Sequence, residues 1–377
     1  MKILSINTGS SSVRLAAFER NGDDSGELAE LASARHDTGR EPEVVLREFA
    51  SAHGLTEPDV VAHRVVHGGM KLTASRLLDK EVEREIERLV PLAPLHNPAA
   101  LRWMRASRAV LGKNMPQVAV FDTAFFTNLP EVARTYAFPY ELAEKYGLQR
   151  YGFHGLAHQA MWQAWQAGRR GGKPEGREGK VISMQLGAGC SMTAIADGLA
   201  CDTSMGFSPL EGLVMATRSG DIDAGLLTFL QGEENLAPKQ LDELLNNRSG
   251  LLGVSGISAD IRELLGSTDE RAQLAVDLFC YRIRKYLGAY LAVLGGAQAV
   301  IFGGGIGENA PSVREKVLAG MEWCGIRIDP EKNRGANGTA QISRETSKIE
   351  VWVIPVDEAA ILAGEAATVV SRLKQKH

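Results

Sequence analysis

Two stretches far apart in the chain share one pattern, and this repeat constrains the fold more than any other feature of the sequence. Residues 3–18 read ILSINTGSSSVRLAAF, and residues 182–198 read ISMQLGAGCSMTAIADG. With Asn7 aligned to Gln185, each copy reads as an apolar strand, an amide, a turn of small residues and a second strand. Such a repeat predicts that each half of the chain contains one copy of the same hairpin.

The length and the order of elements fit a duplicated chain. A chain of 377 residues exceeds what one hydrophobic core usually organises, so two domains are expected. Apolar strand patterns alternate with amphipathic helix patterns, which is typical of the α/β class. The expected strands are 60–67, 117–122, 181–186 and 299–302, the expected helices are 80–90, 155–166 and 269–296, and a glycine-rich loop is expected at 168–180.

Composition argues against several classes of protein. The net charge is −4 with both signs interspersed, so no nucleic-acid-binding surface is expected. Residues 286–307 carry no charge and could span a bilayer in length, but they read better as a helix end followed by a buried strand, so no membrane contact is expected. The four cysteines have neither metal-type nor C-x-x-C spacing, which favours reduced thiols and a cytoplasmic location.

Three glycine-rich turns follow apolar strands and favour a phosphate site. They read NTGSSS at 7–12, LGAGCS at 186–191 and FGGGIGENA at 302–310. Glycine lets backbone N–H groups approach a phosphate, and hydroxyl groups add donors. None of the three is a Walker A loop, because no G-K-[ST] follows. Three such turns in one chain favour a nucleotide-binding protein.

The third turn also supports a different hypothesis. The segment GIGENA at 305–310 matches G-x-G-x-x-A, follows a predicted strand and precedes a predicted helix. Asp329 lies roughly where the ribose-binding acid of a dinucleotide fold would fall. An NAD-dependent oxidoreductase therefore stays open as an alternative, although it leaves the other two turns unexplained.

One charged residue stands inside an apolar strand, and another stands at the carboxyl end of one. Arg64 lies within VAHRVVHGG, where a guanidinium needs a partner, either in a buried ion pair or as part of an anion site. Asp122 ends the strand VAVFD, where ligands of α/β proteins commonly bind, although an aspartate there can equally cap the next turn.

Further candidates lie in YGFHGLAH, MATRSGDIDAG and VIPVDEAAILAG. His154 stands among aromatic and glycine neighbours, and Gly155 takes the place of the glutamate of a zinc-binding H-E-x-x-H helix, so zinc is not expected. Arg218 precedes a glycine and two aspartates that could be a solvated loop. Asp357 and Glu358 begin a predicted helix, where they could favour its dipole or bind a metal.

Taken together, these stretches resemble the acetate/propionate/butyrate kinase family of the sugar kinase, heat-shock protein and actin superfamily. The resemblance extends over nearly the whole chain, in the family's order. The matching segments are NTGSSS, AHRVVHGG, APLHNP, AVFDTAF, YGFHG, DTSMGFSPLEGLVMATRSGDID, GVSGISADIREL, GGGIGEN, CGIRID and IPVDEAAILA.

The resemblance implies a fold and a domain division. It implies an α/β fold with two duplicated actin-like, ribonuclease H-like domains and a cleft between them. The expected N-terminal domain comprises 1–125 and the returning helix 360–377, and the expected nucleotide-binding domain comprises 126–359. A homodimer is implied by the family alone.

The resemblance also implies roles for individual residues. Arg64 would bind the substrate carboxylate, and Asp122, His154 and Arg218 would be catalytic. Asn7 and Glu358 would hold Mg²⁺, or Mn²⁺ in its place. The nucleotide would contact Arg14, Gln185, Leu186, Gly187, Ala188, Gly189, Asp260, Ile261, Arg262, Gly305, Ile306, Gly307, Glu308 and Asn309.

Several positions depart from the family pattern, chiefly in the second hairpin. Arg14 replaces the usual lysine, while Gln185, Ala188 and Cys190 replace a histidine, an asparagine and a serine. Fewer phosphate donors in the second turn keep pyrophosphate open as an alternative phosphoryl donor. Retention of GGGIGEN favours ATP, with ADP as its product.

The leading hypothesis is reversible Mg²⁺-dependent transfer of a phosphoryl group from ATP to acetate or propionate. A carboxylic acid is already ionised at neutral pH, so its carboxylate attacks without a general base. We therefore predict that Asp122 positions Mg²⁺, its waters, or histidine and arginine partners. A nucleotide-binding protein without catalysis is a third hypothesis, and the presence of Arg64, Asp122, His154, Arg218 and Glu358 together argues against it.

Overall fold

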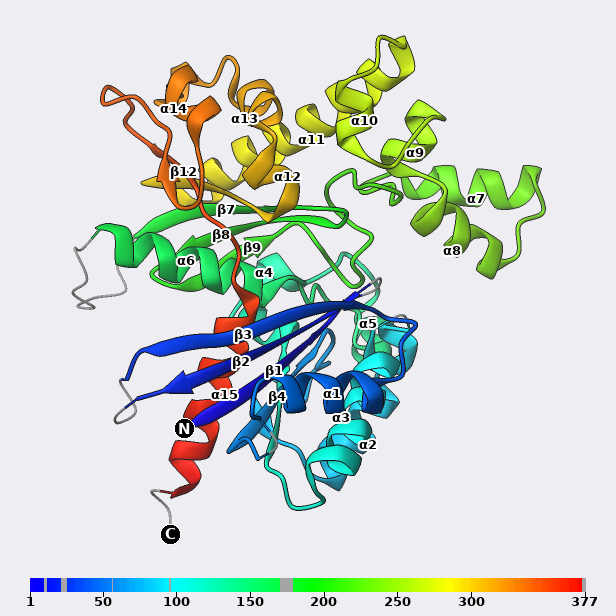
Figure 1. Cartoon of the computed structure of the whole chain (residues 1–377). Helices are drawn as coiled ribbons and strands as arrows, with labels where there is room; N and C mark the ends of the chain where they lie inside the picture. The colour runs from blue at the N-terminus through cyan, green and yellow to red at the C-terminus, as the bar shows by residue number, and fades with distance from the viewer. Residues whose placement is uncertain (10–11, 22–25, 56, 95, 170–178, 375–377) are drawn as a thin grey trace. The chain divides into compact units, whose positions relative to one another are not determined.

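A computed structural model describes residues 1–9, 12–21, 26–55, 57–94, 96–169 and 179–374 (Figure 1). The chain forms two compact units. The first unit comprises 1–127, 153–160 and 357–377, and the second comprises 128–152 and 161–356. The unit boundaries lie near the expected 125/126 and 359/360, and the segment 153–160 joins the first unit. Most of the expected loop at 168–180 falls outside the described residues.

The first unit is built on a six-stranded mixed sheet with the order β3-β2-β1-β4-β6-β5. Its strands are β1 (Lys2–Thr8), β2 (Ser12–Arg20), β3 (Leu28–Asp37), β4 (Val60–Val65), β5 (Arg76–Leu77) and β6 (Gln117–Phe121). Its helices are α1 (Pro42–Ala52), α2 (Lys80–Arg88), η1 (Val90–Leu92), α3 (Asn97–Leu111), η2 (Asp122–Phe126) and α15 (Glu358–Lys374). The predicted strand 60–67 ends at Val65, so His67 lies beyond it.

The second unit is built on a second six-stranded sheet with the order β11-β12-β10-β7-β8-β9. Its strands are β7 (Lys180–Leu186), β8 (Cys190–Ala196), β9 (Leu199–Thr203), β10 (Ala299–Gly303), β11 (Ala340–Gln341) and β12 (Glu350–Val353). Its helices are α4 (Glu131–Arg134), α5 (Tyr140–Tyr146), α7 (Ala224–Glu233), α8 (Pro238–Asn247), α9 (Gly250–Ser255), α10 (Ile261–Leu265), α11 (Glu270–Leu294), α12 (Gly304–Asn309), α13 (Pro311–Leu318), η3 (Glu322–Cys324) and α14 (Pro330–Gly335). The helix α6 (Gly155–Arg169) contributes residues to both units.

The two sheets match strand for strand, which confirms the repeat. β1 pairs antiparallel with β2 and parallel with β4, and β7 pairs antiparallel with β8 and parallel with β10. The next strands, β6 and β12, are again parallel, and each has a short antiparallel partner at the edge. β1 and β7 even share one burial pattern, in which Asn7 and Gln185 are the half-buried sixth residues.

The predicted helix and strand near residue 290 are confirmed as separate elements. α11 ends at Leu294, where Gly295 adopts the left-handed conformation that commonly closes a helix. β10 begins at Ala299 and is fully buried. Among the described residues, no helix is both long and apolar enough to cross a membrane.

The first sheet presents one face to α15 and the other to α1 and α3 (Figure 1). Because side chains alternate along a strand, Ile3, Ala62 and Val120 pack toward α15, while Leu4 and Val61 pack toward α1 and α3. The same alternation continues to the carboxyl ends of the three parallel strands. It carries Asn7, Arg64 and Asp122 toward the side where α15 begins.

Candidate functional site

An arginine and an aspartate from neighbouring parallel strands form a buried ion pair in the first unit. Arg64 is in β4, and Asp122 follows the last residue of β6. The Arg64 Nη2 donates to Asp122 Oδ2 at 2.6 Å, and Nε donates to both carboxylate oxygens at 3.2 Å. The Arg64 side chain is 11% exposed and that of Asp122 is fully buried. The predicted need of Arg64 for a partner is therefore met by Asp122.

Asn7 and Glu358 complete a group of four side chains, called here the Arg64 cluster. The Asn7 Nδ2 donates to Glu358 Oε2 at 2.6 Å, and Arg64 Nη1 donates to Asn7 Oδ1 at 3.1 Å. Arg64 Nη1 also lies 3.6 Å from Glu358 Oε2. Glu358 is the first residue of α15, whereas Asp357 accepts the Ala360 backbone N–H at 3.3 Å as a helix cap. Of the two candidate acids at this helix start, Glu358 therefore faces the cluster.

Opposing effects act on the two central charges. Burial raises the pKa of the Asp122 carboxyl, and the nearby Arg64 guanidinium and the His154 backbone N–H oppose that rise. Burial lowers the pKa of Arg64, but the carboxylates of Asp122 and Glu358 outweigh it and raise the pKa overall. Arg64 is therefore a permanent cation that neutralises the acids around it.

The backbone around His154 closes onto Asp122. His154 has a φ of 58°, a conformation that costs a non-glycine residue of order 1–3 kcal/mol and is often found at functional sites. Its backbone N–H contributes a hydrogen bond to the Asp122 carboxyl. At position 155, a β-carbon would lie 1.9 Å from the Asp122 backbone oxygen and 2.8 Å from Phe125 Cβ. Gly155 therefore lets the start of α6 pack directly against the Asp122 turn.

Three buried histidines of the first unit stay neutral. Burial lowers the pKa of His63 and of His67 to about 4, and that of His158 to about 3. The His63 Nε2 and the Gln117 Oε1 are hydrogen-bonded at 2.8 Å.

The Arg64 cluster has the donor chemistry that a magnesium ion requires. Carboxylate and amide oxygens converge there from Asn7, Asp122 and Glu358. Mg²⁺ commonly takes one or two carboxylates and completes its shell with water and substrate phosphates. Among the described residues, no group of three or more histidine, cysteine or acidic side chains is arranged to hold a metal by itself. The residues thus fit a magnesium ion that is shared with a phosphate ligand.

In the second unit, three of the candidate segments come together at the end of β7. Ala216 donates its backbone N–H to the Ala188 oxygen at 3.1 Å, so the turn at 187–189 contacts the segment that leads to Arg218. Gly304 begins α12 with a φ of 75°, and a β-carbon there would lie 2.6 Å from the Leu186 oxygen. The sequence GGGIGEN therefore forms a helix start packed against β7, where a turn had been predicted.

The substituted residues of the second hairpin have specific contacts. The Cys190 Sγ donates to the Gly187 oxygen at 3.1 Å and is buried, so it faces its own turn. The Gln185 Oε1 is buried and has no hydrogen-bond partner among the described residues. Buried polar atoms are normally paired, so an unpaired amide at this turn favours a bound ligand.

The Arg218 segment is fixed by hydrogen bonds from its own loop and from α11. The Arg218 Nη1 donates to the Pro209 oxygen at 3.1 Å, and burial lowers the pKa of Arg218. Asp221 accepts from the Gly212 backbone N–H and from the Tyr286 hydroxyl, each at 2.7 Å. Asp221 therefore anchors this loop, although its side chain is 39% exposed.

Glu308, the acidic residue of GGGIGEN, stabilises the backbone around α12. Glu308 Oε1 accepts the backbone N–H groups of Gly304 at 2.9 Å and Val356 at 3.2 Å. The buried Arg314 donates to the oxygens of Gly307 and Glu308 at 2.8 and 2.9 Å. These bonds fix α12, which holds the candidates Gly305, Ile306, Gly307, Glu308 and Asn309.

For the other predicted nucleotide contacts, Asp260, Arg262 and Arg14, the hydrogen bonds and ion pairs described here are with residues outside α12. Asp260 and Arg262 pair with each other at the start of α10, where Asp260 caps Ile261–Leu265. Hydrogen bonds from Arg262 lower the pKa of Asp260 to about 2. Arg14 lies 3.2 Å from Glu30 and 3.7 Å from Asp357 in the first unit. The hydroxyls at 10–11 of the first turn fall outside the described residues.

A half-buried polar group in the second unit was not predicted from the sequence. The Glu211 carboxylate accepts from Arg150 Nη2 at 2.6 Å and from the Tyr136 hydroxyl, which in turn accepts the Phe207 backbone N–H at 2.9 Å. Its members lie in unremarkable sequence contexts and are brought together only by folding. Glu211 was part of the segment that suggested the family, but no role had been predicted for it.

The alternative of a dinucleotide fold is not favoured. Asp329, the candidate ribose-binding acid, caps α14 by accepting the backbone N–H groups of Glu331 and Lys332. The second sheet contains the antiparallel strands β8, β9 and β11 and thus differs from a parallel dinucleotide-binding sheet.

Comparisons with known proteins agree with this arrangement. A sequence model of the Acetokinase family matches residues 27–364. The chain is 49% identical over 328 residues to an acetate kinase of Chloroherpeton thalassium, covering 84% of this chain and 77% of that protein. It is 41% identical over 405 residues to an acetate kinase of Dictyoglomus thermophilum, covering 99% of this chain and 100% of that protein.

Solved structures give the same result. The crystal structure of Porphyromonas gingivalis acetate kinase has a TM-score of 0.85 and 39% identity, covering 98% of this chain and 99% of that chain. A propionate kinase from Francisella tularensis has a TM-score of 0.84 and 33% identity, covering 97% and 98%. The chain belongs to the acetokinase family, whose members are phosphotransferases with a carboxyl group as acceptor.

Proposed function

We propose that this protein reversibly transfers the terminal phosphoryl group of ATP to acetate or propionate, giving an acyl phosphate and ADP. The observation that carries the proposal is the Arg64 cluster, in which a buried guanidinium and two carboxylates meet at the carboxyl ends of parallel strands. Ligands of open α/β sheets bind at this end of the strands.

Arg64 is the residue proposed to bind the acid. Its Nε and Nη2 hold Asp122, while Nη1 faces the Asn7 amide oxygen at 3.1 Å. Nη1 also lies 3.6 Å from Glu358 Oε2. A short carboxylate can replace the neutral Asn7 contact and gain a charge-assisted hydrogen bond, which is roughly twice as strong as a neutral one. Asp122 thereby fixes the direction of the guanidinium, in agreement with a positioning role and without any need for a general base.

Asn7 and Glu358 are proposed to hold Mg²⁺. Bound Mg²⁺ would supply positive charge to the phosphate oxygens, which carry the developing charge in phosphoryl transfer. The Asn7 amide links Glu358 to the Arg64–Asp122 pair, since it donates to Glu358 at 2.6 Å and accepts from Arg64 at 3.1 Å.

His154 and Arg218 are proposed to stabilise the transferring phosphoryl group. Phosphoryl transfer needs positioning and cationic or N–H donors around three equatorial oxygens. His154 is held at an unusual φ beside Asp122, and Arg218 is fixed by Pro209. The Arg218 side chain and the His154 backbone are therefore held in place before a substrate binds, in agreement with electrostatic catalysis.

The nucleotide is proposed to contact the turn at 185–189, the segment 260–262 and α12 at 305–309. The support differs among these segments. The Gln185 side-chain oxygen without a partner supports a ligand at the turn 185–189. The close approach of Gly304 to Leu186, which brings α12 against this turn, supports a ligand at 305–309. Asp260, Ile261 and Arg262 rest on the family resemblance, as does Arg14. A homodimer in the cytoplasm is proposed on the same ground.

Trapping of the acyl phosphate tests the proposed reaction. The protein is incubated with Mg²⁺, hydroxylamine, one phosphoryl donor and one acid, and the acyl hydroxamate is measured. ATP with acetate or propionate should give product, and pyrophosphate should give at most a small fraction of that rate. Arg218→Ala should lose product while still binding ATP. The absence of hydroxamate with every acid and donor would refute the proposal, and a higher rate with pyrophosphate would replace the donor.

A further inference from the structure

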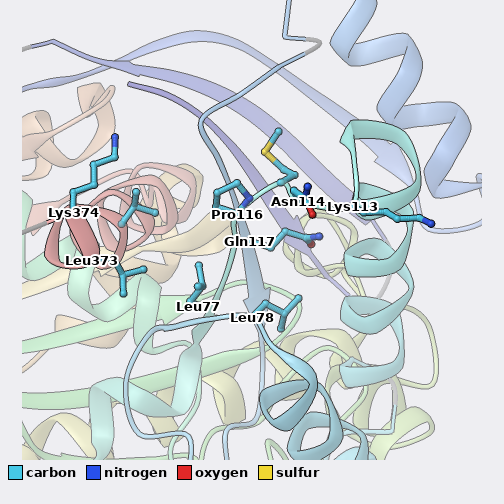
Figure 2. A pocket seen from close by; sticks show the side chains of 10 residues that line it. Leu77, Leu78, Lys113, Asn114, Pro116, Gln117, Leu373 and Lys374 are labelled. Atoms are coloured by element: carbon cyan, nitrogen blue, oxygen red, sulfur yellow. The ribbon is translucent and has the colours of Figure 1, made fainter. Parts of the chain in front are cut away.

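A separate cavity lies at the opposite end of the first sheet from the Arg64 cluster. It measures about 550 Å³ and is lined by residues 77–78, by the 113–117 connection between α3 and β6, and by the end of α15 (Figure 2). β6 starts at Gln117 and Asp122 follows its end, so about 16 Å of strand separates the two regions. The cavity is therefore not part of the site described above.

The lining of this cavity is mainly apolar and partly open to solvent. Leu77 is 39% exposed and Leu373 is 38% exposed, although both are large apolar side chains. Met115 and Pro116 also line the cavity, and Val370 of the lining belongs to the buried core beneath the first sheet. A volume of several hundred Å³ with such walls is typical of pockets for small organic ligands. An apolar chain would remove these side chains from water.

Charge around the cavity has one sign. Lys113 and Lys374 are the charged residues among those described in its lining, and no carboxylate is in that set. The two lysines lie on opposite sides of the cavity (Figure 2). Neither forms an ion pair with a described residue. Each long, exposed side chain can keep its ammonium group in water at the rim while its stem covers apolar surface.

We propose that this cavity binds a single-chain amphipathic anion, with its alkyl chain against Leu77, Met115 and Leu373 and its head group at Lys113 or Lys374. An anionic head at either side meets one of the two lysines and no carboxylate of the lining, whereas a cationic head would be repelled. A chain of several carbons fills a cavity of about 550 Å³ better than acetate does. The head can be a carboxylate or a phosphate ester, since both accept hydrogen bonds from ammonium groups.

Calorimetric titration of the full chain with four eight-carbon probes tests this site. The probes are octanoate, octyl phosphate, octan-1-ol and octylammonium, each added with and without saturating acetate. We expect one octanoate or octyl phosphate per chain, at least tenfold tighter than octanol and octylammonium, with acetate having no effect. The stronger of the two anions identifies the head group. Equal binding of all four probes, no binding of either anion, or displacement by acetate would overturn the proposal.

Matched variants locate the binding. Lys113→Ala with Lys374→Ala should weaken the anion at least fivefold and leave octanol unchanged. Leu373→Glu, which places a carboxylate at an exposed position, should abolish anion binding. The control is Lys239→Ala with Lys285→Ala, which removes two exposed lysines of α8 and α11 and should bind like the parent protein. Unchanged binding in both cavity variants would contradict the assignment. None of these residues belongs to the Arg64 cluster, so the result is independent of the proposed reaction.

Discussion

Arg64 holds the buried Asp122 carboxylate with three hydrogen bonds, the shortest of 2.6 Å between Nη2 and Oδ2. The pair joins the ends of β4 and β6 and leaves one guanidinium nitrogen directed at Asn7. The contribution of this pair to protein stability can be measured separately from its contribution to activity. Replacement of both partners of a buried ion pair by apolar residues often costs little stability, so such a variant tests activity alone. This property makes the pair the natural starting point for mutational tests.

Arg64→Met should destabilise the protein and abolish activity. Removal of one partner leaves an uncompensated buried charge, which costs about 3–5 kcal/mol in the free energy of unfolding. Arg64→Met combined with Asp122→Leu should recover most of that stability but none of the activity. Urea unfolding and the hydroxamate assay on the same samples measure the two effects. Full activity in the double variant would exclude the proposed role of Arg64.

Asp122→Asn should lose activity in a way that added base does not rescue. The amide keeps the size of the side chain but loses the charge that orients Arg64, and the carboxylate substrate needs no proton removed. We expect a loss of roughly 10²-fold or more in kcat, as for other pre-organised electrostatic groups. The rate is measured from pH 6 to 9 with and without imidazole. Recovery of the parent rate at high pH would instead identify Asp122 as a general base.

Gly155→Ala should lower both stability and kcat. The added methyl would lie 1.9 Å from the Asp122 backbone oxygen, so either α6 or the Asp122 turn must move. Gly288→Ala is the matched control, since that glycine lies within α11 and has no atom within 4 Å of the new methyl. The control should gain up to about 1 kcal/mol from better helix propensity. If Gly155→Ala retained the parent kcat, close packing of Gly155 on Asp122 would have no catalytic importance.

Stability should fall as the pH is lowered from about 6.5 toward 4. His63, His67 and His158 have pKa values lowered to about 4, 4 and 3 by burial, so the unfolded chain binds protons in this range and the folded chain does not. Each such histidine lowers the free energy of unfolding by about 1.4 kcal/mol per pH unit within that window. Above pH 7 these residues should contribute no slope.

Urea unfolding at pH 7, 6 and 5 measures this dependence. His63→Gln should reduce the slope, because one group that gains a proton on unfolding has been removed. His53→Gln, at an exposed position of the first unit, serves as the control. Identical slopes in the parent and in His63→Gln would show that His63 is not kept neutral by the fold.

Much of the fold follows from local sequence patterns. Short apolar runs predicted β4, β6, β7 and β10, and the aligned amides Asn7 and Gln185 predicted the duplicated hairpin. These features depend on local hydrophobic runs and turn chemistry, which act over a few residues. The end of the strand at Val65 and the helical form of α12 were missed, because both depend on packing against other elements.

The candidate site was less accessible from sequence. Arg64 and Asp122 could be singled out as charges at strand ends, but their pairing depends on β4 and β6 being neighbours, which is a property of the sheet order. The sequence did not indicate that position 155 must be a glycine. A β-carbon is excluded there only because the Asp122 turn packs against the start of α6. Likewise, Cys190 was interpreted as a lost phosphate donor, whereas its thiol faces the Gly187 oxygen.

Direct observation of the products by ³¹P nuclear magnetic resonance tests the central claim. The parent protein, ATP, Mg²⁺ and acetate are mixed, and the signals of ATP, ADP, acetyl phosphate and inorganic phosphate are followed with time. We predict that acetyl phosphate and ADP appear in equal amounts, only when acetate is present, and that Arg64→Met with Asp122→Leu forms neither. ATP consumption that yields inorganic phosphate equally with and without acetate, or acetyl phosphate formation by the double variant, would contradict the account.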